Sequence, residues 1–214
     1  MAVTQEGRTA PDFRLLDKDG SEHRLSRLPA AATVLFFYPK DDTPGCTLEA
    51  KEFSAAVKKF TAMNVAVFGI SGGDPKSKEK FCRKHNLGIT LLADHDFAVA
   101  AAYGVYGLKK FMGREYKGIN RTTFVVGPDR RVLKVFEEVK PAGHAAEVLD
   151  FLKGVVVKGS AAPAPVKTAA PRAKPSAGKR PKARTAKGDK PRKSKTKSAA
   201  TKTGSEKKKP ARRR

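Results

Sequence analysis

Apolar runs and helix-like stretches alternate along residues 1–157 of the chain. The runs 33–38 and 65–70 are continuous, β-branched and aromatic, which is typical of strands buried within a sheet. The stretches 48–60 and 75–85 instead have the apolar spacing or the starting residues of helices. Because each predicted strand is followed by a predicted helix, this part of the chain predicts an α/β arrangement.

Shorter segments continue the pattern and end it with a hairpin. The predicted strands 122–126 and 132–136 are joined through a Gly-Pro-Asp turn, which favours an antiparallel pair. The other predicted segments are short strands at 11–15 and 90–92 and helices at 97–103 and 143–154. The sequence therefore predicts a mixed β-sheet flanked by helices, an α/β fold.

Charge divides the chain into two parts. The 214 residues include 45 basic and 21 acidic side chains, a formal net charge of +24. Residues 158–214 hold 21 of the basic residues against Asp189 and Glu206, whereas all 12 Phe and all 4 Tyr lie in residues 1–157. A segment without aromatic residues and with this charge cannot bury enough apolar surface to offset chain entropy. We therefore expect one folded domain over 1–157 and a disordered basic tail over 158–214.

Neither a membrane span nor a secretory signal is predicted. No run approaches the ~20 apolar residues that a spanning helix needs, and Met1–Gly7 is short and polar. Two cysteines without a signal peptide favour a reducing, cytoplasmic compartment, where cysteines more often react than form structural disulfides. No metal or cofactor is expected, because the histidines lack metal-ligand spacing and are interpreted as structural or surface residues: His23, His85, His95 and His144.

Cys46 gives the strongest chemical signal. It ends the octet 39–46, Pro-Lys-Asp-Asp-Thr-Pro-Gly-Cys, between a buried strand and a helix expected to have acids in its first turn. Unpaired N–H groups and the positive end of a helix dipole favour a thiolate at such a place. A buried structural cysteine is the alternative. The Pro/Gly turn before Cys46 makes a reactive cysteine the better interpretation.

The octet resembles the active-site stretch of peroxiredoxins. Pro39, Thr43 and Cys46 match the signature Pro-x-x-x-Thr-x-x-Cys, and the neighbouring FYPK and TPGCT sequences are similar to the Q-type, or bacterioferritin comigratory, group. Downstream, Phe-Met-Gly at 111–113, followed by Tyr116, Gly118, Ile119 and Arg121, resembles a loop of that group. The likeness covers about residues 5–153. It implies a thioredoxin-like fold and a peroxidase that reduces hydrogen peroxide and organic hydroperoxides.

The resemblance assigns a role to each residue of this set. Cys46 would be the nucleophile, activated by the helix N-terminus and a cation. Thr43 would accept a hydrogen bond from the peroxide while donating towards the sulfur. Backbone N–H groups of Gly45 and Cys46 would hold the reacting oxygens. Arg121 would polarise the peroxide, and Pro39 would shape the loop and limit water access.

Each of these residues also has a plainer interpretation. Thr43 fits a turn or helix cap, Pro39 a strand end, and Arg121 an ordinary surface arginine. The resemblance implies that Glu49 holds the Arg121 guanidinium in place, but an acid near a helix start explains Glu49 equally well. Apart from Glu49, the family pattern as a whole favours the catalytic interpretation.

The second cysteine is the candidate resolving residue. Many Q-type members have that cysteine five residues after the first, but the position here is Lys51. A subgroup resembles this chain in having it on the helix after the second strand, where Cys82 lies. The neighbouring cations Lys80, Arg83 and Lys84 are expected to raise the thiolate fraction of Cys82.

This arrangement implies an intramolecular Cys46–Cys82 disulfide, reduced by thioredoxin or a related dithiol protein. The two Cα atoms must come within ~7 Å, so one or both helices would unwind locally. Alternatively, Cys82 packs beside Phe81 as a small core residue, and an external thiol resolves Cys46. The group resembled is often monomeric, so we expect a monomer.

The tail resembles the C-terminal tails of linker histones and of some bacterial nucleoid proteins. A flexible segment of net charge +19 is expected to bind DNA through its phosphates without reading sequence. A nuclear localisation signal, attraction to anionic lipid and a solubilising tail are the alternatives. The enzyme would then be associated with the nucleoid, or nuclear in a eukaryote. The candidate contacts are Lys179, Arg180, Lys182, Arg192, Lys193, Lys207, Lys208, Lys209, Arg212, Arg213 and Arg214.

Two functions therefore remain in competition at this stage. The first is a thiol peroxidase whose tail binds nucleic acid. The second is a nucleoid or chromatin architectural protein with an accessory or regulatory peroxidase domain. The intact set of Pro39, Thr43, Cys46 and Arg121 favours the enzyme, because DNA compaction does not require it.

Overall fold

A computed structural model describes residues 2–111 and 114–156. The predicted tail, with its candidate DNA contacts, and the Met112-Gly113 part of the family motif lie outside these residues. The central sheet has seven strands in the order β2-β1-β5-β4-β3-β8-β9. They are β1 (Arg14–Asp17), β2 (Glu22–Arg24), β3 (Ala32–Phe37), β4 (Val65–Ser71), β5 (Thr90–Ala93), β8 (Thr122–Val126) and β9 (Val132–Phe136).

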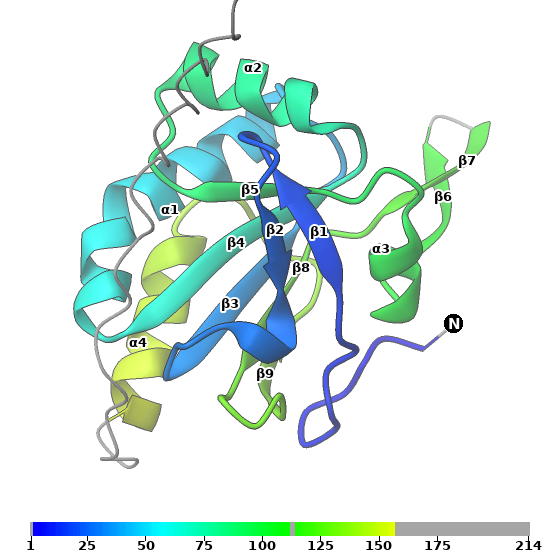
Figure 1. Ribbon diagram of the computed structural model, residues 1–214. Helices are drawn as coiled ribbons and strands as arrows, with labels where there is room; N and C mark the ends of the chain where they lie inside the picture. The colour runs from blue at the N-terminus through cyan, green and yellow to red at the C-terminus, as the bar shows by residue number, and fades with distance from the viewer. Residues whose placement is uncertain (1, 112–113, 157–214) are drawn as a thin grey trace, which may run out of the picture. The chain divides into compact units, whose positions relative to one another are not determined.

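Two helical crossovers connect the parallel strands at the centre of this sheet. The strands β3, β4 and β5 are parallel, and they are joined by helices α1 (Pro44–Ala62) and α2 (Pro75–His85). All other pairs in the sheet are antiparallel. The remaining elements are η1 (Leu25–Arg27), α3 (Ala98–Ala102), α4 (His144–Val156) and a separate hairpin of β6 (Tyr106–Phe111) and β7 (Arg114–Ile119) (Figure 1).

The core lies on both faces of the sheet, as the continuous apolar run of β3 requires. Alternate residues of a strand point to opposite faces. Phe36 accordingly packs in a cluster with Phe53 of α1 and residues of α4, while Phe37 packs with Tyr103 and Phe124 in a second cluster. Figure 1 shows α1 and α4 side by side along one face. The mixed sheet flanked by helices is a thioredoxin-like fold, so the predicted fold class is confirmed.

The structure corrects three details of the predicted elements. The helix expected at 48–60 begins at Pro44, which suits a first helical position because proline lacks an N–H. The first turn therefore contains Cys46 and no acid. The edge strand β2 was missed because its sequence, Glu-His-Arg, has no apolar residue. The region resembling a family loop at 111–121 instead includes strand β7 and the end of β6, whose charges and glycines hide the strand pattern.

The membrane prediction can be checked against the helices. Within the part of the chain that the structure describes, no helix is both long and apolar enough to cross a bilayer.

Candidate active site

Cys46 lies at the carboxyl end of the parallel strands, where β3 leads into α1. It is the third residue of the helix, and its side chain is buried. The first helical hydrogen bond runs from the Thr47 N–H to the Thr43 carbonyl at 2.8 Å. The N–H groups of Gly45 and Cys46 precede that bond, so they belong to the set that a helix leaves unpaired at its start. The thiol is thus at the positive end of a 19-residue helix.

Arg121 connects this thiol to a buried carboxylate. Its Nη2 donates to the Cys46 Sγ at 3.2 Å, and its Nη1 donates to Glu49 Oε2. Glu49 follows Cys46 by about one helical turn, and Arg121 lies between β7 and β8. The structure therefore brings together the three residues that the resemblance grouped, and it puts Arg121 against the sulfur rather than on the open surface.

Burial dominates the electrostatics of this trio. It raises the pKa of Glu49 to about 7, although Arg121 opposes the shift. Burial also disfavours the Arg121 cation, but Glu49 and Cys46 outweigh it and raise the pKa of Arg121. Within the described part of the chain, Glu49 Oε1 has no hydrogen-bond partner. The guanidinium is therefore a fixed cation held by one carboxylate oxygen and presented to the sulfur.

A cavity of about 300 Å³ adjoins Arg121 and offers a small molecule access to it. Lys109 of β6 is a second cation in its lining, and burial followed by Arg121 lowers the pKa of this lysine. A larger, more open hollow of about 600 Å³ lies along β9 and the start of α4, and its lining contains neither Cys46 nor Arg121. The smaller cavity therefore adjoins the cation, although Cys46 is not part of its lining. Sequence reasoning did not identify Lys109.

Thr43 is placed differently from its predicted role. The Thr43 hydroxyl donates to the Lys40 carbonyl at 3.2 Å rather than towards the sulfur, although its lone pairs remain able to accept a hydrogen bond. Thr43 is the N-cap residue of α1 by position, but its side chain makes no capping bond. Pro39 is exposed, and its role in shaping the loop and limiting water access stays a prediction.

Gly45 leaves room for the cation. A Cβ at this position would lie 3.2 Å from Pro141 Cγ and 3.4 Å from Arg121 Nη2. A side chain there would therefore press on Pro141 and crowd the guanidinium. Pro141, which lies between β9 and α4, is a second residue of this region that sequence reasoning missed.

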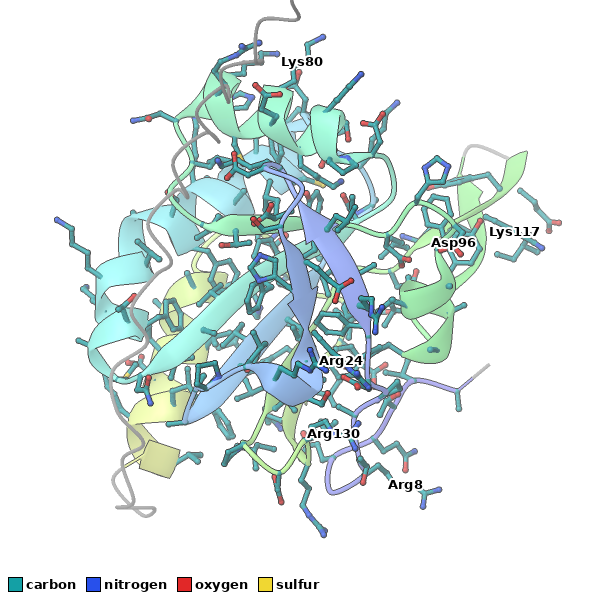
Figure 2. All side chains as sticks on the ribbon, viewed as in Figure 1. Arg8, Arg24, Lys80, Asp96, Lys117 and Arg130 are labelled. Carbon is teal, nitrogen blue, oxygen red and sulfur yellow. The ribbon has the colours of Figure 1, made fainter. Side chains whose placement is uncertain are left out.

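Cys82 occupies a different environment, on the buried side of α2. Burial raises the pKa of its thiol to about 11, with Asp41 adding to the shift and the cations Lys18 and Lys78 opposing it. The expectation that neighbouring cations of α2 raise its thiolate fraction is wrong. Lys80, Arg83 and Lys84 are exposed, and Figure 2 shows Lys80 at the outer side of the helix. Neither cysteine is in a disulfide.

His23, His85 and His144 have polar side-chain partners. His144 Nε2 is 2.9 Å from the Thr123 hydroxyl, and His23 Nε2 is 2.8 Å from Asp17. Among the residues that the structure describes, no group of three His, Cys, Asp or Glu side chains could hold a metal ion.

Known proteins resemble the part of the chain that contains this site. The AhpC/TSA family model matches residues 7–135. A bcp protein of Helicobacter pylori is 44% identical over 152 residues, which cover 71% of this chain and 100% of the relative. Peroxiredoxin Bcp of Bacillus subtilis is 40% identical over 71% of this chain and 97% of its own length. A structure of the bacterioferritin comigratory protein of Xanthomonas campestris, described for its alkyl peroxide reduction activity, aligns with a TM-score of 0.63 and 34% identity over 67% of this chain and 92% of that one.

Proposed function

The chain belongs to the AhpC/TSA family, in its Bcp and peroxiredoxin Q group of peroxidases, and we propose that Cys46 is its peroxidatic cysteine. The observation that carries this assignment is the 3.2 Å contact between Arg121 Nη2 and the Cys46 sulfur at the start of α1. A thiol held by a helix N-terminus and a guanidinium has the environment that activates a sulfur nucleophile.

The first step oxidises Cys46. The thiolate attacks the nearer oxygen of the hydroperoxide, an S–O bond forms, and the O–O bond breaks. The leaving oxygen takes the peroxide proton and departs as water or an alcohol, so that Cys46 becomes a sulfenate, which a proton from solvent converts to sulfenic acid. Arg121 and the N–H groups of Gly45 and Cys46 stabilise the negative charge that develops on the oxygens. The lone pairs of the Thr43 hydroxyl accept the peroxide O–H.

The second step forms the disulfide. The Cys82 thiol attacks the Cys46 sulfenic acid, an S–S bond forms, the S–O bond breaks, and water leaves with the thiol proton. Both thiols are buried and not bonded to each other. We expect the loop before α1 or the helix α2 to open so that the two sulfurs can reach bonding geometry. A dithiol protein such as thioredoxin then reduces the disulfide by exchange, and its own two thiols become a disulfide.

The substrates proposed are hydrogen peroxide and organic hydroperoxides. The alkyl peroxide reduction described for the Xanthomonas campestris neighbour supports the organic class. The cavity of about 300 Å³ beside Arg121 has room for a small alkyl group.

Three proteins test this cycle. Peroxide consumption coupled to thioredoxin should be fast for the wild type, absent for Cys46→Ser, and strongly reduced for Cys82→Ser. After one equivalent of peroxide, the wild type should be a monomer with an internal disulfide. If Cys82→Ser still forms a monomeric internal disulfide, or keeps full thioredoxin-dependent turnover, the resolving role is wrong and an external thiol resolves Cys46.

The basic tail is proposed to bind DNA without sequence preference. Its support is a net charge of +19 without any aromatic residue for base stacking. The Helicobacter pylori relative is matched over its whole length by 71% of this chain, so part of this chain has no counterpart there. Such a protein would be associated with the nucleoid, or with chromatin if nuclear.

Truncation after Gly159 tests the tail. DNA retention should be lost, while the peroxidase rate stays within about twofold, because the family match ends before the tail. If ten charges meet phosphates, the logarithm of the wild-type binding constant should fall with the logarithm of salt at a slope of about −9. Unchanged DNA binding by the truncated protein contradicts the proposal. A wild type that binds DNA but consumes no peroxide would instead favour the architectural function.

A further inference from the structure

Asp41, in the loop just before α1, is the centre of a hydrogen-bond network that reaches α2. Its carboxylate accepts bonds from the hydroxyls of Tyr38 at 2.7 Å, Ser71 at 3.2 Å and Ser77 at 3.1 Å. It also accepts two from Lys78 Nζ, at 2.9 and 3.1 Å. Ser77 and Lys78 belong to α2, whereas Tyr38 and Asp41 belong to the segment that leads to Cys46. We call these five residues the Asp41 network.

Lys78 makes this network difficult to open. Its side chain is completely buried, and its Nζ also donates to the Ser71 hydroxyl at 2.5 Å and to the Gly72 carbonyl at 2.7 Å. A buried ammonium that loses its partner leaves an uncompensated charge, which is strongly destabilising. The loop must therefore remain on α2 for as long as Lys78 stays buried.

Asp42 ties the same loop to the other end of the helix. Its carboxylate contacts Lys84 Nζ at 2.5 Å and His85 Nε2 at 2.7 Å. The backbone of Asp42 has φ of 58°, a left-handed conformation that is uncommon for residues other than glycine. These two contacts favour that conformation, and the loop can relax when they are lost.

The Asp41 network and the Asp42 contacts both involve residues that are close to the two cysteines in sequence. Lys78 precedes Cys82 on α2 by about one turn, and Lys84 follows it, whereas Asp41 and Asp42 lie a few residues before Cys46. The thiols belong to one apolar cluster, which also contains Tyr38 and Phe81. Any movement that brings the two sulfurs into bonding contact changes the loop, the helix or both.

We propose that the Asp41 network and the Asp42 contacts form a latch that sets the rate of disulfide formation. The latch holds the loop on α2 in the reduced enzyme, so that Cys46 meets peroxide in an assembled site. Its release lets the Cys82 thiol attack the Cys46 sulfenic acid, with loss of water. This inference rests on the proposed resolving role of Cys82. It makes Asp41, Asp42 and Lys78 positioning residues for the second step rather than catalytic residues.

The latch also decides a competition at Cys46. A sulfenic acid that waits can react with a second peroxide, which forms sulfinic acid and releases water or an alcohol. A weaker latch should therefore give faster disulfide formation and less sulfinic acid. The rate of the first oxidation should change little, because neither Asp42 nor Ser77 touches the sulfur or Arg121.

Asp42 and Ser77 give the cleanest test, because neither side chain is buried and their variants should fold. Asp42→Asn removes the ion pair with Lys84 and the carboxylate that contacts His85. Ser77→Ala removes a hydroxyl that lies 3.1 Å from Asp41 Oδ2 and 2.8 Å from the Asp74 carbonyl. Glu79→Gln is the matched control, since Glu79 pairs with Arg83 within α2 and does not reach the loop. Full-length reduced proteins would receive one equivalent of hydrogen peroxide, followed by alkylation at timed intervals and mass spectrometry of the Cys46 and Cys82 peptides.

Disulfide formation should be about two- to fivefold faster in Asp42→Asn and Ser77→Ala than in the wild type and Glu79→Gln. The second-order rate of Cys46 oxidation should remain within about twofold. A general loss of structure would instead slow both steps. Equal or slower disulfide formation in both latch variants overturns the inference.

Substitutions at the buried Lys78 should change the rate of disulfide formation more than those at Asp42 and Ser77. Lys78→Met should accelerate disulfide formation by about tenfold or more. The double variant Asp41→Asn/Lys78→Met leaves no unpaired buried charge and should have an effect of the same size. The sulfinic acid yield at excess peroxide should fall in parallel. Circular dichroism first identifies which of the two remains folded. If the wild type itself forms no Cys46–Cys82 disulfide, the resolving role fails; if it does and the variants match it, only the latch fails.

Discussion

The two cysteines are almost equally buried and belong to one apolar cluster, yet their positions on the helices and the charges near their sulfurs differ. Cys46 is 2% exposed and Cys82 is 5% exposed. Cys46 lies in the first turn of α1, with the Arg121 guanidinium on its sulfur. Cys82 is the eighth of the 11 residues of α2, beside the ring of Phe81 in the core. Burial alone therefore does not distinguish a reactive thiol from an inert one.

The difference lies in what accompanies burial. A helix offers unpaired N–H groups in its first turn, but pairs them further along. A fixed guanidinium adds a compensating charge at Cys46, whereas desolvation raises the pKa of Cys82 to about 11. The assembled protein thus places a cation and unpaired N–H groups at one sulfur and suppresses the thiolate of the other. Under the proposed cycle, Cys82 would react only after its helix or the neighbouring loop has opened.

The largest expected effect comes from removing the cation at Cys46. Arg121→Met should lower the second-order rate of peroxide reduction by about 10²- to 10³-fold, the usual loss when one oxyanion donor is removed. Arg121→Lys should recover only part of it, because an ammonium cannot bond the sulfur and Glu49 together with a planar fork. Stopped-flow measurement with hydrogen peroxide tests this. A rate within a few-fold of the wild type would place the activating charge elsewhere.

The second effect concerns Cys82 alone, in the Cys46→Ser protein. A rise of two pH units in the pKa of the thiol, from 9.0 to about 11, lowers its thiolate fraction at neutral pH by about 100-fold. Alkylation of the native protein should therefore be slow and should still increase with pH up to about 11. In urea the same thiol should react at an ordinary rate. Fast alkylation that levels off near about pH 9 in the native protein would contradict this contrast.

A smaller effect on stability is expected at Glu49. Burial raises its folded-state pKa from 4.5 to about 7, so the folded protein binds this proton more tightly than the unfolded chain does. The stability from that proton is fully present below the unfolded pKa and is lost as the pH rises through about 7. From about pH 5 to about pH 8, the free energy of unfolding should therefore fall more in the wild type than in Glu49→Gln. Urea titrations at both pH values measure the difference, and an identical pH dependence would count against it.

The fold was largely predictable, because buried parallel strands have an unmistakable pattern. The run 33–38 is apolar throughout, and all six residues of β3 are buried. The β6–β7 hairpin was not predictable in this way. Large apolar residues of this hairpin, such as Leu108 and Tyr116, are exposed, so its strands lack the regular alternation of buried and exposed positions. Element boundaries also depended on local detail, as the early start of α1 at Pro44 shows.

The site was predictable only as far as its motif. Cys46 could be inferred from a strand, a turn and a helix in sequence. Its contact with Arg121 joins residues 75 positions apart, and only the family resemblance suggested it. Sequence neighbours misled the prediction for Cys82, because the exposed cations beside it in sequence lie on the outer side of the helix. The two cations that oppose the rise in the pKa of Cys82 are Lys18 and Lys78. Lys18 lies in the turn between β1 and β2, and Lys78 lies one turn earlier on α2.

The central claim is that this difference in surroundings makes Cys46, and not Cys82, the first target of peroxide. The direct measurement is a pulse of one equivalent of hydrogen peroxide to the reduced wild type in the presence of a sulfenic acid-trapping dione, followed by peptide mass spectrometry. The trapped adduct should be found on Cys46, with none on Cys82. An adduct mainly on Cys82 would contradict the account.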